Sequence, residues 1–121
     1  MNWNITAGRP VYVQLVEQLE LALVAGEFPP GSRIPPVREL AADAGVNPNT
    51  MQRALAELER TGLVYTQRTA GRFVTEDAAV IDSAKQELAH QQVGAFLRRM
   101  ERMGYDREQT AQLVRSWEEE A

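Results

Sequence analysis

Residues 34–74, IPPVRELAADAGVNPNTMQRALAELERTGLVYTQRTAGRFV, decide the fold of this 121-residue chain. Three apolar residues in the first part of the stretch share one helical face: Leu40, Ala41 and Ala44. Gly45 follows them and takes the left-handed backbone conformation that ends a helix without steric cost. Asn47 and Pro48 then supply an N-cap and a first residue for a second helix. The stretch therefore predicts two helices joined by a turn of about three residues.

The second helix has one apolar stripe, and its other faces are polar. The stripe consists of Met51, Ala54, Leu55 and Leu58. Outside it, in the first turns, lie Asn49, Thr50, Gln52 and Arg53. Asn and Gln side chains can pair with adenine, Arg with guanine, and a helix N-terminus attracts phosphate oxygens. This exposed surface is therefore suited to the bases and backbone of DNA.

After Gly62, two short extended runs at 64–66 and 72–75 flank a polar turn, which predicts a β-hairpin. Arg68 and Arg72 stand at the two sides of that turn. A hairpin tip that carries arginines beside the second helix can reach the DNA backbone or the narrow groove. The sequence thus predicts a mainly α fold with a small β-hairpin wing, a winged helix-turn-helix DNA-binding domain over residues 1–75.

A further amphipathic helix is predicted before this motif, over about residues 10–25. Its stripe consists of Tyr12, Leu15, Val16, Leu19 and Leu23. Gly and Pro residues between 26 and 31 then break the chain. We expect this helix to pack on the two helices of the motif, with Tyr12 in the core.

After the wing, residues 76–121 predict a C-terminal helical hairpin. A helix over about 76–103 is interrupted at Gly104, and Asp106 with Gln109 three residues later forms a capping-box pattern for a last helix. The last helix carries a stripe of Thr110, Leu113, Val114 and Trp117. Two helices cannot bury their stripes alone, so a second copy of the chain is predicted to cover them. The predicted dimerisation residues are Ile81, Leu88, Val93, Phe96, Leu97, Met100, Leu113, Val114 and Trp117.

The net charge of −4 is unevenly distributed along the chain. Residues 33–75 hold six Arg against four Asp and Glu, whereas residues 1–32 hold one basic against three acidic residues and 76–121 hold six against ten. The predicted DNA-binding segment is therefore the only net-positive one. Because nonspecific affinity grows with the number of phosphates neutralised, such a modest excess favours specific binding by two copies together.

Composition also restricts the class of protein and its compartment. The chain has no cysteine, which is compatible with a reducing cytosol, and it has no apolar run long enough to span a membrane. The start, MNWNITAGRP, has neither the basic region nor the apolar region of an export signal. We expect a cytoplasmic protein without a membrane partner, too short for a large catalytic domain.

Three segments at family spacing resemble the GntR family of bacterial transcription regulators: PVYVQLVEQL from residue 10, GEFPPGSRIPPVRELA from residue 26, and VNPNTMQRALAELERTGLVYTQR from residue 46. The resemblance covers about residues 9–75. It implies double-stranded DNA as the partner and a set of DNA-facing positions: Arg38, Asn47, Asn49, Thr50, Gln52, Arg53, Arg68 and Gly71, with Arg72 beside the last. Gln52 is favoured for base contact.

Some of these positions also have a purely structural interpretation. Arg38 could form a surface ion pair with Glu39 or Asp43, and Asn47 could act only as an N-cap. Two departures from the family pattern also matter. Pro36 stands where relatives have a small hydroxylated residue that caps the helix, and Thr69 stands where many have a glycine in the wing tip. We expect one lost cap and a differently shaped wing tip.

The short two-helix tail is similar to that of the YtrA subgroup, whose members are homodimers often encoded with ABC transporter genes, and this resemblance implies a homodimer that controls such genes. Larger subgroups carry long effector-binding or aminotransferase-like domains, for which this chain has no room. A small-molecule effector that binds between the tail helices or at the dimer interface remains an open alternative.

Other functions have weaker support in the sequence. Glu87 and His90 stand three apart on one helix, but two ligands do not make a metal site and the chain has no other His and no Cys. No pairing of nucleophile and base indicates an enzyme, and no cofactor is predicted. The main alternative is a winged-helix protein-interaction module, which would more often carry apolar residues where Asn49, Gln52 and Arg53 stand. The sequence thus favours a sequence-specific repressor that binds a pseudo-palindromic operator as a homodimer.

Overall fold

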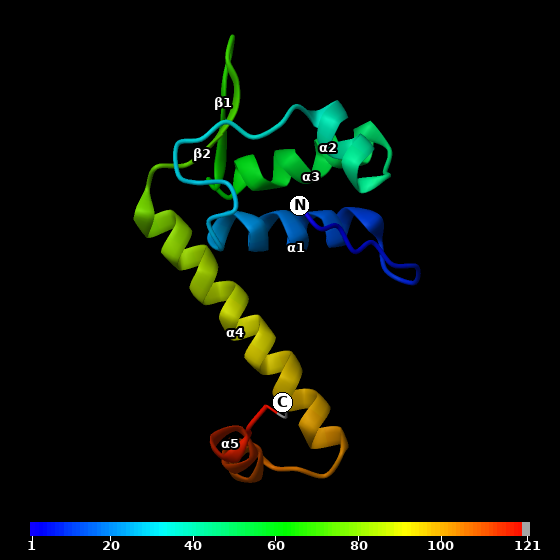
Figure 1. The fold of residues 1–121 in the computed structure, drawn as a ribbon, viewed down its shortest axis with the longest axis vertical. Coiled ribbons are helices and arrows are strands. Elements are labelled where there is room, and N and C mark those ends of the chain that lie inside the picture. Colours follow the sequence, from blue (N-terminus) through cyan, green and yellow to red (C-terminus); the bar gives the residue numbers. More distant parts are fainter. Residues whose placement is uncertain (120–121) are drawn as a thin grey trace. The chain divides into compact units, whose positions relative to one another are not determined.

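A computed structural model describes residues 1–119 of the chain (Figure 1). The chain contains α1 (Val11–Val24), α2 (Val37–Ala44), α3 (Pro48–Arg60), β1 (Val64–Gln67), β2 (Gly71–Val74), α4 (Ala78–Arg102) and α5 (Arg107–Ser116). It divides into two compact units, Met1–Lys85 and the residues from Gln86 onward. The first unit ends inside α4, so the start of α4 belongs with the winged domain. A functional division into 1–75 and 76–121 stays a prediction.

The predicted apolar stripes meet in one core of the first unit. Its fully or almost fully buried side chains come from every element up to β2: Leu15, Leu19 and Leu23, Leu40 and Ala41, Met51, Ala54, Leu55 and Leu58, and Leu63, Val64 and Val74. Helix α3 packs against both α1 and α2. Its polar faces remain outside this core. Tyr12, expected in the core, packs against it but is only partly buried.

The turn between α2 and α3 has the predicted chemistry. Gly45 ends α2 in the left-handed conformation, with φ 70° and ψ 36°. Asn47 caps α3 by accepting a hydrogen bond from the backbone N–H of Asn49 at 2.7 Å, and Pro48 is the first helical residue. Pro36 precedes α2 without any side-chain cap, as its missing hydroxyl predicts. The turn thus fixes where the first turn of α3 begins.

The wing is an antiparallel hairpin in which Val64 pairs with Val74 and Gln67 with Gly71. The second strand ends at Val74, one residue earlier than predicted, although the N–H of Thr75 still donates to the carbonyl oxygen of Leu63 at 2.9 Å. The segment before α2 lies along the other edge of β2, a pairing that the sequence did not predict (Figure 1). There the N–H of Ile34 donates to the carbonyl oxygen of Arg72 at 3.0 Å.

The two tail helices confirm the predicted order, with shorter bounds. Helix α4 starts at Ala78 and ends at Arg102, and the predicted capping box of Asp106 and Gln109 opens α5. Trp117 was expected on the stripe of the last helix, but α5 ends at Ser116 and Trp117 has an extended backbone. Periodicity does not reveal where such a short helix ends. None of the helices within residues 1–119 has the length and hydropathy needed to cross a bilayer.

Candidate nucleic-acid interface

The first turns of α3 present polar side chains to solvent. Asn49, Gln52 and Arg53 are exposed and Thr50 is half-buried, whereas the neighbouring Met51 is fully buried. Within the described part of the chain, the side chain of Gln52 forms no hydrogen bond. Its amide therefore keeps both donor and acceptor groups free for a base edge. Asn47 is already engaged as the N-cap, so any DNA contact that it makes must be compatible with capping.

Arg53, unlike Gln52, contacts a side chain of another helix. Its guanidinium lies over the ring of Tyr12 in α1, with the central carbon 4.0 Å from the ring centroid. Such a cation–π contact contributes about 0.5–1 kcal/mol at an exposed site. Successive helical residues diverge by roughly 100°, so Gln52 faces another direction. The contact holds Arg53 beside α1, at the flank of the α3 surface.

Arg38 is exposed in the first turn of α2. Within residues 1–119 it forms no ion pair with Glu39 or Asp43, which was the structural alternative for this residue. Asp43 instead accepts a hydrogen bond from the indole N–H of Trp3 at 2.8 Å. The positive charge of Arg38 therefore remains available to an anion outside the chain.

The arginines at the end of α3 and in the wing differ in their partners. Arg72 donates from Nε to Oε1 of Glu59 at 2.6 Å, and Arg60 pairs with Glu57 at 2.5 Å. Arg68, at the wing tip, is exposed and has no ion pair among the described residues. Two of the predicted interface charges are thus free, at Arg38 and Arg68, while Arg72 is held inside the domain.

Glu59 connects the wing to α3. Its Oε1 also accepts a hydrogen bond from the hydroxyl of Thr66 at 2.5 Å, so a single carboxylate contacts both strands of the hairpin. The hydrogen bond from Thr66, followed by that from Arg72, holds the pKa of Glu59 below its ordinary value. Hydrogen bonds to the charged form favour it, which makes the ionised carboxylate a stabilising group.

We expect Glu59→Gln to lower the free energy of unfolding at neutral pH by about 1 kcal/mol, since it removes the charge that the two donors stabilise. A folded-state pKa below the unfolded one gives stability that is full above the unfolded pKa, about 4.3, and is lost as pH falls through the folded pKa. Denaturant titrations should show the difference from wild type at pH 7 and its loss in acid. A constant difference down to pH 2 would contradict this origin.

Gly71 is required because its φ is 109°, where L side chains are strained. A Cβ there would also lie 2.9 Å from Nε of Arg33, a flexible side chain that would have to move. Arg33 is exposed, and together with Gly71 and Arg72 it lines a pocket of about 290 Å³ that also includes Pro36 and Val37. Sequence reasoning missed Arg33. The only available signal was its position as the first basic residue of the net-positive segment.

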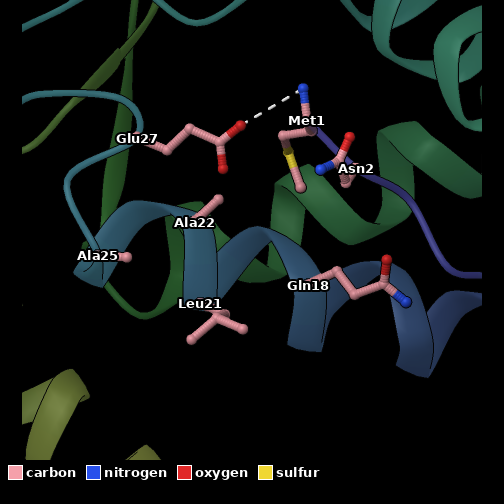
Figure 2. A pocket seen from close by; sticks show the side chains of 7 residues that line it. All are labelled: Met1, Asn2, Gln18, Leu21, Ala22, Ala25 and Glu27. Carbon is pink, nitrogen blue, oxygen red and sulfur yellow. Dashed lines mark ion pairs between the residues drawn. The ribbon is translucent and has the colours of Figure 1, made fainter. Parts of the chain in front are cut away.

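A larger pocket of about 570 Å³ lies along α1, among residues that were not predicted to face DNA (Figure 2). It is lined by Met1, Asn2, Gln18, Leu21, Ala22, Ala25 and Glu27. The N-terminal ammonium of Met1 pairs with Glu27 at 3.4 Å, as the dashed line in Figure 2 shows. This pocket adds no residue to the candidate interface.

The tail helices expose apolar side chains to solvent. Helix α4 has no buried residue along its whole length. Val93 is 54% exposed, Val114 58% and Trp117 70%, and Leu113 is also exposed. The other predicted dimerisation residues, Leu88, Phe96, Leu97 and Met100, are half-buried. Ile81 differs from them because it packs, with Val80 and Ala84, against the core of the first unit.

A family model described as "Bacterial regulatory proteins, gntR family" matches residues 11–74. The chain is 34% identical over 119 residues to the HTH-type transcriptional regulator YhcF of Bacillus subtilis (strain 168), and the match covers 98% of each chain. It is 41% identical over 69 residues to the HTH-type transcriptional repressor YtrA of the same organism, which covers 57% of this chain and 53% of YtrA.

Solved structures agree with this result. A GntR family transcriptional regulator from Listeria monocytogenes superposes with a TM-score of 0.85 at 35% identity, over 94% of this chain and 100% of that one. The DNA-binding domain of AraR in complex with operator ORX1 matches with a TM-score of 0.57 at 26% identity, over 62% of this chain and 96% of that one. These matches confirm the predicted winged helix-turn-helix fold.

Proposed function

The chain belongs to the gntR family of bacterial regulatory proteins, and we propose from this premise that it is a transcriptional repressor. In this proposal it binds a pseudo-palindromic operator as a homodimer. The family and the relatives are DNA-binding transcription regulators, not enzymes, and YtrA is a repressor by name. The likeness to YtrA extends the proposal to the control of ABC transporter genes. The protein would act in the cytoplasm, where the operator is accessible.

The observation that carries the proposal is the set of polar groups around α3 that the described residues leave without partners. Asn49 and Gln52 are exposed on the first turns of α3, and Arg38 in α2 and Arg68 in the wing have no ion pair within residues 1–119. This combination suits a helix in the major groove with cationic contacts to the backbone on both sides. The alternative function is a winged-helix protein-interaction module. Such a module would gain little from this surface, because burying polar groups against a partner costs free energy unless each one finds a hydrogen bond.

Support for a homodimer comes from the tail. A helix of 25 residues without a buried side chain leaves apolar area in water that a second copy can cover. Two copies would then place two α3 helices in major grooves about one helical turn of DNA apart, or a multiple of it. A small-molecule effector that binds at this interface remains compatible with the proposal.

The first test is a gel shift with the purified protein and its own upstream intergenic DNA, at two salt concentrations and with an unrelated competitor duplex. Salt-sensitive retardation of the upstream fragment alone, at two protomers per duplex, is the expected result. If the upstream fragment and the competitor bind equally at both salt concentrations, the protein does not recognise an operator there.

Arg38→Gln and Arg68→Gln are each expected to weaken binding to every duplex and to flatten its salt dependence. Each lost phosphate contact should reduce the slope of log affinity against log salt by about 0.9 per protomer. Fluorescence anisotropy at five salt concentrations measures that slope. Arg99→Gln, at an exposed arginine of α4, is the matched control and should keep the wild-type slope. A wild-type slope for Arg38→Gln would place that side chain away from the phosphates.

A further inference from the structure

Two arginines lie at the edge of the wing, and their surroundings differ. The Arg72 side chain is only 18% exposed and pairs with Glu59, so the pair has no net charge. A neutral pair neutralises little phosphate charge, so it releases few of the counterions condensed on the DNA. Arg72 is therefore poorly placed to neutralise a DNA phosphate, although its position in the sequence predicts that role.

Arg72 instead contributes to the placement of the hairpin on α3. Glu59, near the end of α3, accepts from Thr66 of β1 and from Arg72 of β2 on the same oxygen atom. Loss of the Arg72 guanidinium would leave this carboxylate with one donor and remove the side-chain link between β2 and α3. The base of the hairpin stays in the core through Val64 and Val74, so the link bears on the part of the wing toward Arg68 at its tip.

Arg33 differs from Arg72 in both exposure and pairing. Its backbone is fixed, because Arg33 forms a β-bridge with Phe73 and the next residue, Ile34, donates to the carbonyl oxygen of Arg72. Its side chain is exposed, lies directly over Gly71 and has no ion pair within residues 1–119. A full positive charge thus stands on an ordered segment at the base of the wing.

The surroundings of Arg33 leave room for an anion. The pocket of about 290 Å³ that it lines also includes Val37, the first residue of α2, whose helix starts without a side-chain cap. The first N–H groups of an uncapped helix need acceptors from outside the helix. A DNA phosphate supplies an acceptor and a negative charge to this place between α2 and the wing.

We propose that Arg33 contacts a DNA phosphate between α2 and the wing, and that Arg72 is a positioning residue that holds the wing on α3. The inference rests on the proposed DNA-binding function. It differs from the sequence-based prediction, which named Arg72 and not Arg33 as a DNA-facing residue. A Cβ at residue 71 would displace the guanidinium of Arg33 from the edge of the wing.

The test measures the salt dependence of binding to a mixed-sequence 30-base-pair duplex by fluorescence anisotropy, with the full-length wild type and single variants. We expect Arg33→Gln to lower the slope of log affinity against log salt by about 0.9 per protomer and Arg33→Lys to restore it. Arg72→Gln should reduce affinity by the same factor at every salt concentration, which leaves the slope at its wild-type value. Thermal unfolding of each variant shows whether the domain is intact.

A double-mutant cycle provides a second measurement of the role of Arg72. Glu59→Gln and Arg72→Gln both remove the same bridge, so the double variant should bind no more weakly than Arg72→Gln alone. Additive losses, or a reduced slope for Arg72→Gln, would overturn the positioning role. A wild-type slope for Arg33→Gln would overturn the phosphate contact. If the wild type itself binds no duplex at low salt, the proposed function fails, which is a distinct outcome.

Discussion

Val93→Asp combined with Val114→Asp is expected to yield a monomer whose affinity for the operator is at least about 100-fold lower. Both side chains are more than half exposed, at 54% and 58%, so the charges should not unfold the protomer. They would instead have to be desolvated in a dimer interface, which costs several kcal/mol per unpaired charge. Loss of the dimer also removes the gain from binding two half-sites together, about 10²–10⁴ in affinity. Sedimentation and anisotropy measure the two effects.

The matched control is Gln92→Asp combined with Gln112→Asp. It adds the same charge at exposed polar positions of the same two helices. This control should remain a dimer and bind like the wild type. If the valine variant sediments as a dimer, the apolar tail surface is not the dimer interface. If it is monomeric and binds the operator with wild-type affinity, binding does not require two copies.

Gln52→Ala is expected to relax base preference at one position in each half-site. The truncation removes an exposed amide from the first turns of α3, where a bidentate contact to a base is worth about 1–3 kcal/mol. That range corresponds to roughly 5- to 150-fold in affinity for each half-site. Binding to a set of operator duplexes with single base changes measures both the loss and the preference.

An exposed glutamine elsewhere provides the control for this variant. Gln92→Ala, in α4, should leave both affinity and preference unchanged. A Gln52→Ala protein that binds all duplexes more weakly but in wild-type order would show that Gln52 contacts the backbone. Unchanged affinity and order would remove Gln52 from the interface, and Asn49 would then be the next residue to test.

The fold could be predicted because each of its elements has a local signal. The stripe through Met51, Leu55 and Leu58 and the turn chemistry of Gly45 and Asn47 act over a few residues, so the sequence alone reveals them. The pairing of the segment before α2 with β2 was not predicted, because Arg33 and Phe73 lie far apart in the chain and nothing at either position indicates their pairing. Trp117 was placed in a helix because its spacing continues the stripe, although the backbone has already left the helix there.

The candidate site could be predicted only in terms of residue type and exposure. Exposure of Asn49, Gln52 and Arg53 follows from the buried stripe beside them. The partners of the charged side chains do not, because Glu59 and Arg72 or Tyr12 and Arg53 meet only when separate elements pack together. For this reason Arg72 was predicted from the sequence to be a free, DNA-facing charge. The position of Arg33 beside β2 likewise depends on a pairing between segments far apart in the chain.

The two ion pairs along α3 also have a kinetic consequence. Glu57 cancels the charge of Arg60 and Glu59 that of Arg72, both near the end of α3, while Arg38 and Arg68 have no ion pair within residues 1–119. These exposed charges on α2 and the wing should attract the duplex during diffusion, before any contact forms. Association would be fast at low ionic strength and slow steeply as salt is added, with dissociation governed separately by the contacts of α3.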